Sequence, residues 1–449
     1  MTHTFLHDDP FVAEVEEALT TVPMLDAHTH LTVGKLQARG LHDLLLYHMV
    51  VSDLYAAGCP SGARLTEFPG VPDTAEAHAR IREALPYLPF IRNTSCFWGL
   101  RILLHDLFAW HDPITAENWE YLDGMVRERA GDATVPREIL CRANIHKLTT
   151  ELARRGQGEE DDLFQYSLEW AFFTRTQRDE YDTTLYELER CWGQPTGSPI
   201  PHAASTRPAP ARSIHTLDDV HAALRYFIDT MIASGVLSNA THVSTDVGFR
   251  AVSDEQMSAA LARRSVAGRE ERDIYTSYIH EAFLTLLEAD APQIAFQFSY
   301  AAEPLPHETA SLLPQSSIAD LADCVARHPK VKFVCLEASR HGNQSLCTLG
   351  RELPNFSLMG YWWHNFFPGA MRQVMEERLD MLPMNKNIGF FSDAYSIEWT
   401  YAKARIVRRQ LAIVLAQKIR QGQYDLPAAL AIARHIFFET AQQVLCMEH

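Results

Sequence analysis

The chain has 449 residues and a formal net charge of −17, from 40 Lys and Arg against 57 Asp and Glu. Apolar residues make up 47% and charged residues 22%, a composition that excludes disordered and low-complexity chains. The acidic balance argues against a nucleic-acid partner, because phosphate binding needs a basic surface. It leaves room for a small basic pocket that would bind an anionic metabolite.

The sequence carries no visible signal for export or membrane insertion. The N-terminal segment MTHTFLHDDP has neither the basic stretch nor the apolar core of a signal peptide. No apolar run reaches the roughly 18–20 residues of a membrane span. The eight cysteines form no CxxC pair, and several lie in apolar stretches, as buried thiols do. We therefore expect a cytoplasmic protein with reduced thiols and no membrane partner.

The first part of the chain predicts a helix over 10–20 and then a strand over 22–27, which leads directly into His28 and His30. Residues 35–135 have a mostly helical pattern. This segment is too long for a simple connection between two strands. We interpret it as a helical insertion after the first strand.

After residue 135 the pattern begins to alternate, with a helix at 136–143 and a strand ending near Thr149. The segment 159–192 is aromatic and acidic, and its pattern places no strand clearly. Residues 194–213 are rich in Pro, Ser and Ala, which predicts a long surface loop. We prefer a loop to a domain linker, because the alternation resumes directly afterwards.

From residue 215 onward, a helix followed by a strand recurs five times. The predicted helices cover 216–235, 270–290, 317–328, 343–353 and 369–382; the predicted strands cover 241–245, 294–298, 331–336, 356–362 and 388–392; and a helical tail covers 398–447. Such alternation favours a parallel sheet. With the earlier segments, eight strands are expected. The chain is therefore predicted to be an α/β protein, a single (β/α)8 TIM-type barrel over 1–449, with an open doubly wound sheet as the alternative.

His28 and His30 provide the clearest chemical signal. In a strand, residues i and i+2 point to the same side, so both imidazoles can converge on one point. Neutral imidazole binds Zn, Mn, Fe or Co. Asp393 follows the last predicted strand, and the carboxyl ends of barrel strands share one face. It could complete a three-ligand site, act as a base beside the metal, or cap the following helix.

Other candidates lie at strand ends on the same predicted face. Trp362 and Trp363 end one strand and could form the wall of a sugar site, or simply pack. Arg340 follows another strand and is a candidate carboxylate clamp, since guanidinium binds carboxylate with two hydrogen bonds. His48 lies among apolar residues, where a histidine is usually part of the core. We find no GxxxxGK[ST], GxSxG or HExxH motif.

Four motifs occur together in a fixed order: DAHTHL at 26–31, LLLYH at 44–48, MGYWW at 359–363 and SDA at 392–394. In this combination the chain resembles the uronate isomerase (glucuronate isomerase) family of the amidohydrolase superfamily. The resemblance covers most of the chain and is thin between about 150 and 240.

The resemblance implies one divalent metal, zinc in most members and Mn, Co or Fe as alternatives, bound by His28, His30 and Asp393. It implies interconversion of glucuronate with fructuronate and of galacturonate with tagaturonate, by moving a proton between adjacent carbons through an enediol. Asp393 would be the base and His48 an active-site histidine. The residues that would bind the sugar-acid substrate are Tyr47, Arg340, Trp362, Trp363 and Tyr395.

The chain departs from the family at two positions of this site. Tyr395 stands where the family usually has an arginine, and Met49 stands where close relatives have a tyrosine. The first alternative is therefore a metal-dependent hydrolase or decarboxylase acting on another small carboxylate or sugar acid. The second is a binding protein without turnover. A homo-oligomer is compatible with a barrel whose outer helices are free, and the sequence does not indicate one.

Overall fold

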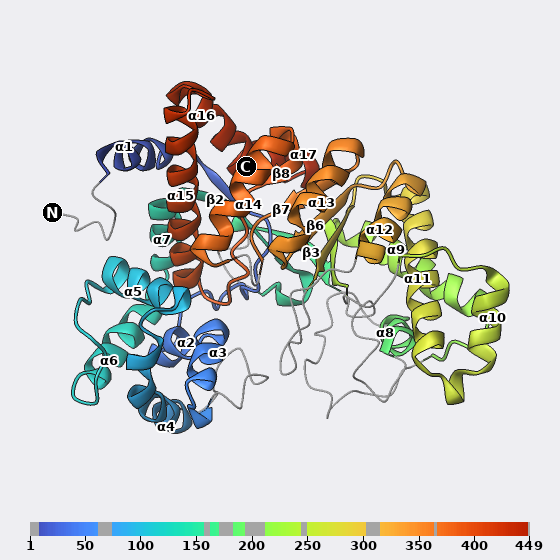
Figure 1. Ribbon diagram of the computed structural model, residues 1–449. Coiled ribbons are helices and arrows are strands. Elements are labelled where there is room, and N and C mark those ends of the chain that lie inside the picture. Colours follow the sequence, from blue (N-terminus) through green and yellow to red (C-terminus); the bar gives the residue numbers. More distant parts are fainter. Residues whose placement is uncertain are drawn as a thin grey trace. The chain divides into compact units, whose positions relative to one another are not determined.

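The computed structural model describes residues 9–61, 74–156, 162–169, 183–193, 212–243, 249–301, 315–362 and 366–447. The chain divides into two compact units, which we describe separately (Figure 1). The first contains Met1–Leu148, Gly156–Asp161 and Ser392–Leu430. The second contains Thr149–Arg155, Asp162–Phe391 and Ala431–His449. Organisation as a single domain stays a prediction.

Eight strands form one sheet in which the spatial order follows the order in the chain, β1 to β8. The strands are β1 (Met24–Asp26), β2 (Ile145–Glu151), β3 (Phe164–Glu169), β4 (Ser238–His242), β5 (Ala295–Tyr300), β6 (Phe333–Glu337), β7 (Phe356–Met359) and β8 (Asn387–Ile388). Every neighbouring pair whose register is described is parallel. This confirms the predicted (β/α)8 class, because parallel strands in chain order need a crossover between each pair.

The first unit is mostly helical, as the pattern over 35–135 predicts. Its helices are α1 (Pro10–Leu19), α2 (Leu41–Leu45), α3 (His48–Ala56), α4 (Thr74–Ala84), α5 (Ser95–Phe108), α6 (Trp119–Ala130), α7 (Val135–Ala143) and α15 (Ile397–Arg420). Helix α15 packs against α1, α5 and α7 (Figure 1). Its buried cations have partners: Arg409 binds Glu16 at 2.7 Å, and Arg408 donates to the carbonyls of Val22 and Ala143. These contacts fix α15 beside the chain that enters β1.

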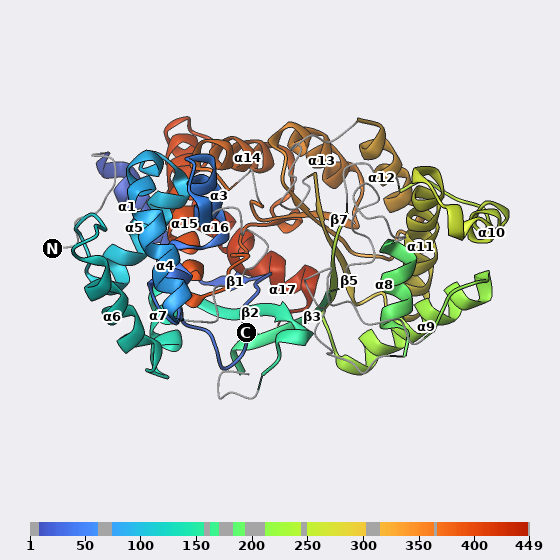
Figure 2. The same ribbon diagram turned by 90° about the horizontal axis from the view of Figure 1, so that it is seen from below.

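The second unit carries helices that lie between the later strands and one helix near the end of the chain. They are α8 (Thr183–Cys191), α9 (Leu217–Ser234), α10 (Asp254–Ala262), α11 (Arg269–Asp290), α12 (Gln315–Arg327), α13 (Arg340–Glu352), α14 (Pro368–Met381) and the terminal α17 (Thr440–Leu445). Figure 2 shows α8, α9 and α11 beside one another. An aromatic cluster fills the core between sheet and helices, with Phe296 and Phe298 from β5 contacting Phe249, Phe283 and Tyr300. Burial of such side chains is the main stabilising contribution here.

Several predicted boundaries were wrong. The last strand was expected over 388–392 but ends at Ile388, because the N–H of Gly389 donates to the carbonyl of Ile436 at 2.7 Å instead of continuing the sheet. The strand β3 lies in the segment 159–192, where a strand was counted toward the expected eight but its position was not predicted. The helical tail is interrupted after Arg420, and α16 (Leu426–Arg434), a π-helical turn over His435–Glu439 and α17 follow. The predicted loop over 194–213 falls largely outside the described residues.

No helix within the described parts of the chain combines the length and the apolar character needed to cross a bilayer.

Candidate metal site

The site is built where the segments following β1 and β8 meet inside the first unit. The carboxylate of Asp26, at the end of β1, accepts the backbone N–H of Ser392 at 2.8 Å and that of His28 at 3.5 Å. Backbone hydrogen bonds also join Asp393 to His28 and His30 to Ala394, at 3.0 and 2.8 Å. Burial raises the pKa of Asp26 to about 7, although these N–H groups lower it. The two segments are thereby held side by side.

Three side chains converge there as the sequence predicts. The Oδ1 atom of Asp393 lies 3.1 Å from Nε2 of His30 and 3.6 Å from Nε2 of His28. One ligand atom from each residue lies within 4.8 Å of the others. The two imidazole rings are nearly perpendicular, at 87°. The three side chains are between 11% and 17% exposed. The group is therefore mostly buried but still accessible to solvent.

The protonation state of Asp393 suits a cation. Burial alone would raise the pKa of its carboxyl, but the hydrogen bond from His30 and the charges of His30, Lys403 and His28 outweigh burial and hold the pKa well below its usual range. The carboxyl is therefore ionised. Two imidazoles and one carboxylate form a three-ligand set with positions left for water or substrate, which is the pattern of catalytic divalent metals. These residues fit the predicted metal.

Aromatic rings form a wall beside the ligands. Tyr395 stacks on His30, with ring centroids 4.6 Å apart and an interplanar angle of 22°. Behind it, the buried Tyr47 stacks on Trp399 at 4.3 Å, and its hydroxyl donates to the carbonyl of Asp393 at 3.1 Å. Tyr395 therefore supports the ring of His30, one of the three candidate ligands. The sequence did not single out Trp399, since it lies in a helix rich in apolar residues.

The other predicted site residues have varied positions. His48 is the first residue of α3, and its side chain lies outside the described residues, as does Trp363. Arg340 is the first residue of α13 in the second unit, is exposed, and donates to Oε1 of Gln373 at 3.1 Å. Trp362 is buried after β7 in the same unit. The roles of these four residues stay predictions.

The second unit brings together a pair that sequence reasoning missed. His242 ends β4, and its Nδ1 lies 2.8 Å from the hydroxyl of Ser299 near the end of β5. The ring of His242 meets that of Trp362 edge to face, with centroids 5.5 Å apart. The pair lies near the carboxyl ends of β4 and β5, the end of the strands at which barrels of this class place their active sites. The sequence feature that could have indicated this pair is the histidine within the segment 241–245, which is rich in β-branched residues.

A second group of potential metal ligands lies on helices α11 and α12 and is explained without a metal. Glu281, Cys324 and His328 have ligand atoms within 4.8 Å of one another. However, the guanidinium of Arg327 binds both oxygens of Glu281, at 3.2 and 2.8 Å, and His328 approaches the same carboxylate at 3.2 Å. Burial would raise the pKa of Glu281, but these hydrogen bonds hold it at about 2. We interpret the group as an ion-pair network.

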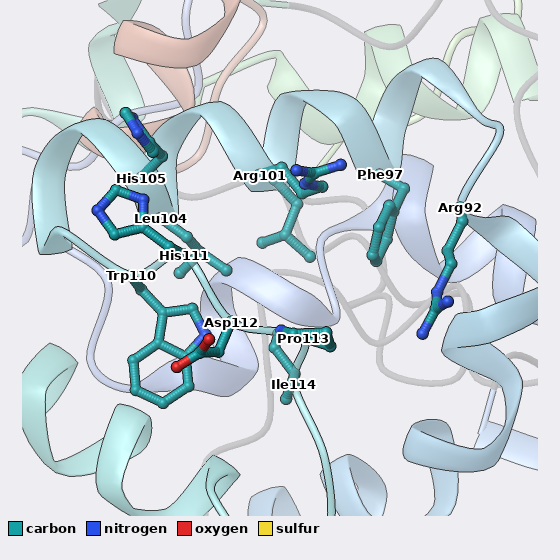
Figure 3. A pocket seen from close by; sticks show the side chains of 11 residues that line it. Arg92, Phe97, Arg101, Leu104, His105, Trp110, His111, Asp112, Pro113 and Ile114 are labelled. Atoms are coloured by element: carbon teal, nitrogen blue, oxygen red, sulfur yellow. The ribbon is translucent and has the colours of Figure 1, made fainter. Parts of the chain in front are cut away.

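A separate cavity of about 220 Å³ opens in the first unit between α5 and the segment that follows it (Figure 3). Phe97 and Leu104 line it from the helix, Trp110 and Ile114 from the segment, and Arg92 stands at one end. None of the predicted site residues lines this cavity.

Comparison with known proteins tests the resemblance. No family model and no curated protein sequence matches the chain. Solved structures do match over its whole length. A glucuronate isomerase from Caulobacter crescentus has a TM-score of 0.80 at 14% identity, covering 100% of this chain and 97% of that one. A uronate isomerase from Thermotoga maritima has a TM-score of 0.78 at 13% identity, covering 99% and 100%.

A uronate isomerase from Bacillus halodurans C-125 matches with a TM-score of 0.69 at 17% identity, covering 99% of this chain and 98% of that one. Three separate isomerases thus share this fold. The resemblance predicted from the four motifs is confirmed at the level of the fold.

Proposed function

We propose that the protein is a metal-dependent aldose–ketose isomerase acting on hexuronates of the glucuronate and galacturonate type. The observation that carries this proposal is the convergence of His28, His30 and Asp393 after the first and last strands, in a fold shared with uronate isomerases. Sequence identity of 13–17% supports the fold and leaves the substrate to experiment.

The proposed isomerisation requires the site to transfer protons between neighbouring atoms of the sugar. The C2 proton of the aldose is removed, a proton is delivered to C1, and the hydroxyl proton moves from O2 to O1, with an enediol between the two sugars. A divalent metal, zinc in the first place, would polarise the oxygens of the substrate when bound. Asp393 directs Oδ1 toward both imidazoles. We assign the proton transfer to its second oxygen, Oδ2, because the carboxyl group is ionised at neutral pH and can accept a proton.

The aromatic wall would orient the sugar. Tyr395 presents its ring along His30, and ring faces of this kind pack against the apolar faces of sugars. A substrate carboxylate still needs a cation. Arg340 is the residue that the sequence predicts for this role; in the second unit its guanidinium is exposed, and its one described hydrogen bond is to the neutral side chain of Gln373.

The stacking of Tyr395 also supports the alternative function. An aromatic ring where relatives have an arginine removes a cation and a two-pronged donor from the site. A metal-dependent hydrolase or decarboxylase acting on another small carboxylate is therefore the second candidate. The number of tightly bound ions separates the two, because two ions per chain at this site would favour a hydrolase.

The test uses protein loaded with zinc or manganese and incubated with D-glucuronate or D-galacturonate in D2O, with C1 and C2 followed by NMR. We expect ketose to form with deuterium incorporated next to the carbonyl. Asp393→Asn should abolish conversion, while the exposed Asp425→Asn serves as a matched control and should not. Absence of both conversion and deuterium exchange in metal-loaded protein would refute the isomerase.

A further inference from the structure

We propose that Lys403 is a positioning residue of the metal site: its buried ammonium group holds the backbone of Ser392 and Asp393 so that the Asp393 carboxylate stays aimed at the metal. This inference rests on the metal site of the proposed function and adds a residue to it that no motif indicates.

Lys403 has an unusual position for a lysine. It lies in the second turn of α15 and is only 3% exposed. Lysine is almost never buried in this way unless its charge has partners. Its Nζ donates to the carbonyl of Ser392 at 2.6 Å and to that of Asp393 at 3.4 Å. The same Nζ lies 5.2 Å from the ring centroid of Tyr47, so a cation–π contact adds to the two hydrogen bonds.

The backbone that Lys403 contacts needs such support. Asp393 has φ +51°, in the left-handed region that costs a residue with a Cβ free energy. Regular sheet pairing has ended at Ile388, so no strand partner imposes this conformation. It persists only where surrounding contacts over-determine it. Here the Asp393 carbonyl accepts hydrogen bonds from both Lys403 and Tyr47, and the Asp393 N–H donates to His28.

The consequence for the carboxylate is geometric. With φ fixed and the carbonyl held on the side of α15, the side chain of Asp393 leaves the backbone toward the two histidines. Its Oδ1 then lies within reach of both imidazoles. Groups outside the ligand shell that orient ligands in this way commonly change metal affinity by about 10–100-fold when removed.

The charge of Lys403 and its positioning role predict opposite changes in metal affinity when the residue is replaced. An ammonium close to a divalent cation repels it, so removing that charge without disturbing the ligands would tighten metal binding. If Lys403 acts by positioning, its loss weakens binding in spite of the removed repulsion. The sign of the change therefore distinguishes the two roles.

The experiment measures Co2+ affinity and the visible Co2+ absorption of the full chain at neutral pH, for wild type and for Lys403→Met. Lys418→Met is the matched control, because Lys418 is in the same helix, is equally buried, and bonds Gln423. We expect Lys403→Met to bind Co2+ about 10–100-fold more weakly and with a changed absorption band, and Lys418→Met to resemble wild type. Lys403→Arg, which keeps a donor and the charge, should recover part of the affinity.

Tyr47→Phe gives a second route if the methionine variant does not fold. It removes the other hydrogen bond to the Asp393 carbonyl and should also weaken binding. Unchanged or tighter Co2+ binding with an unchanged spectrum in the folded variant would overturn the positioning role. Wild-type protein that binds no Co2+ would refute the metal site itself. Normal metal binding without isomerase activity would refute only the activity, and the effect of Lys403→Met would still stand.

Discussion

Gly360 directly follows β7 and precedes Tyr361 and Trp362. Replacing it tests how closely the end of β7 packs against Phe391. The φ of Gly360 is +54°, and a Cβ added to it would overlap the ring of Phe391. Its N–H donates to the carbonyl of Ile388 at 2.6 Å, and its own carbonyl accepts from Nη1 of Arg378 at 2.7 Å. A side chain at this position would therefore strain the backbone and collide with the core.

The cost of Gly360→Ala can be worked from these contacts. A left-handed conformation costs alanine about 1–2 kcal/mol, and forcing a methyl group into a packed core costs about 1–3 kcal/mol. We therefore expect the free energy of unfolding to fall by about 2–5 kcal/mol. Gly124→Ala is the control, because its added Cβ meets no atom within 4 Å and it lies inside helix α6. That change should raise stability by up to about 1 kcal/mol.

Urea unfolding followed by tryptophan fluorescence would measure both variants beside the wild type. The two substitutions should shift the midpoint in opposite directions. If Gly360→Ala unfolds within about 0.5 kcal/mol of the wild type, as ordinary surface changes do, the close packing of Phe391 against the end of β7 is wrong.

Three other outcomes concern acid, a buried cation and the metal. The folded pKa of Glu281 is about 2 against an ordinary 4.5, so its ion pairs stabilise the fold fully above pH 4.5 and are lost as the pH falls toward 2. Glu281→Gln should therefore lower the free energy of unfolding by about 1–3 kcal/mol in urea titrations at neutral pH. A difference in this free energy between wild type and variant that does not become smaller in acid would contradict the reasoning. Arg378→Met leaves the carbonyl of Gly360 without its donor and should lower the free energy of unfolding by about 1–3 kcal/mol, whereas the exposed Arg351→Met should change it little. Chelator treatment should lower the melting temperature and zinc should restore it, since a ligand at 1,000 times its Kd adds about 4 kcal/mol; an unchanged melting temperature would mean that no metal binds the folded state.

The sequence predicted the parts of the site that depend on local pattern. The strand before His28 and His30 and the apolar run before Asp393 are short-range signals, and the structure brings these three residues together. Lys403 and Trp399 were missed because a buried lysine or tryptophan in a long helix has the same local pattern as an exposed one. Only the packing of α15 against the chain near Asp393 gives them their contacts.

Strand boundaries were the weaker predictions. The run over 388–392 is apolar enough for a strand of five residues, yet β8 contains only two. Its end depends on Gly389, whose N–H bonds the carbonyl of Ile436 near the other end of the sequence. Such a long-range partner leaves no mark on the local pattern. In β3, the aromatic and acidic residues obscure the alternation of buried and exposed positions that a strand normally shows.

The discontinuous first unit has a consequence for how the protein is made. The hydrogen bond between Asp26 and Ser392 joins residues 366 positions apart. At about 5–20 residues per second, a ribosome needs roughly 20–70 s to synthesise the chain between them. Until then the two histidines cannot meet their carboxylate, and the helices of the first unit lack α15 as a packing partner. The candidate metal site is therefore complete only late in synthesis, so metal uptake at this site would report on chains in which Asp393 has already met His28 and His30.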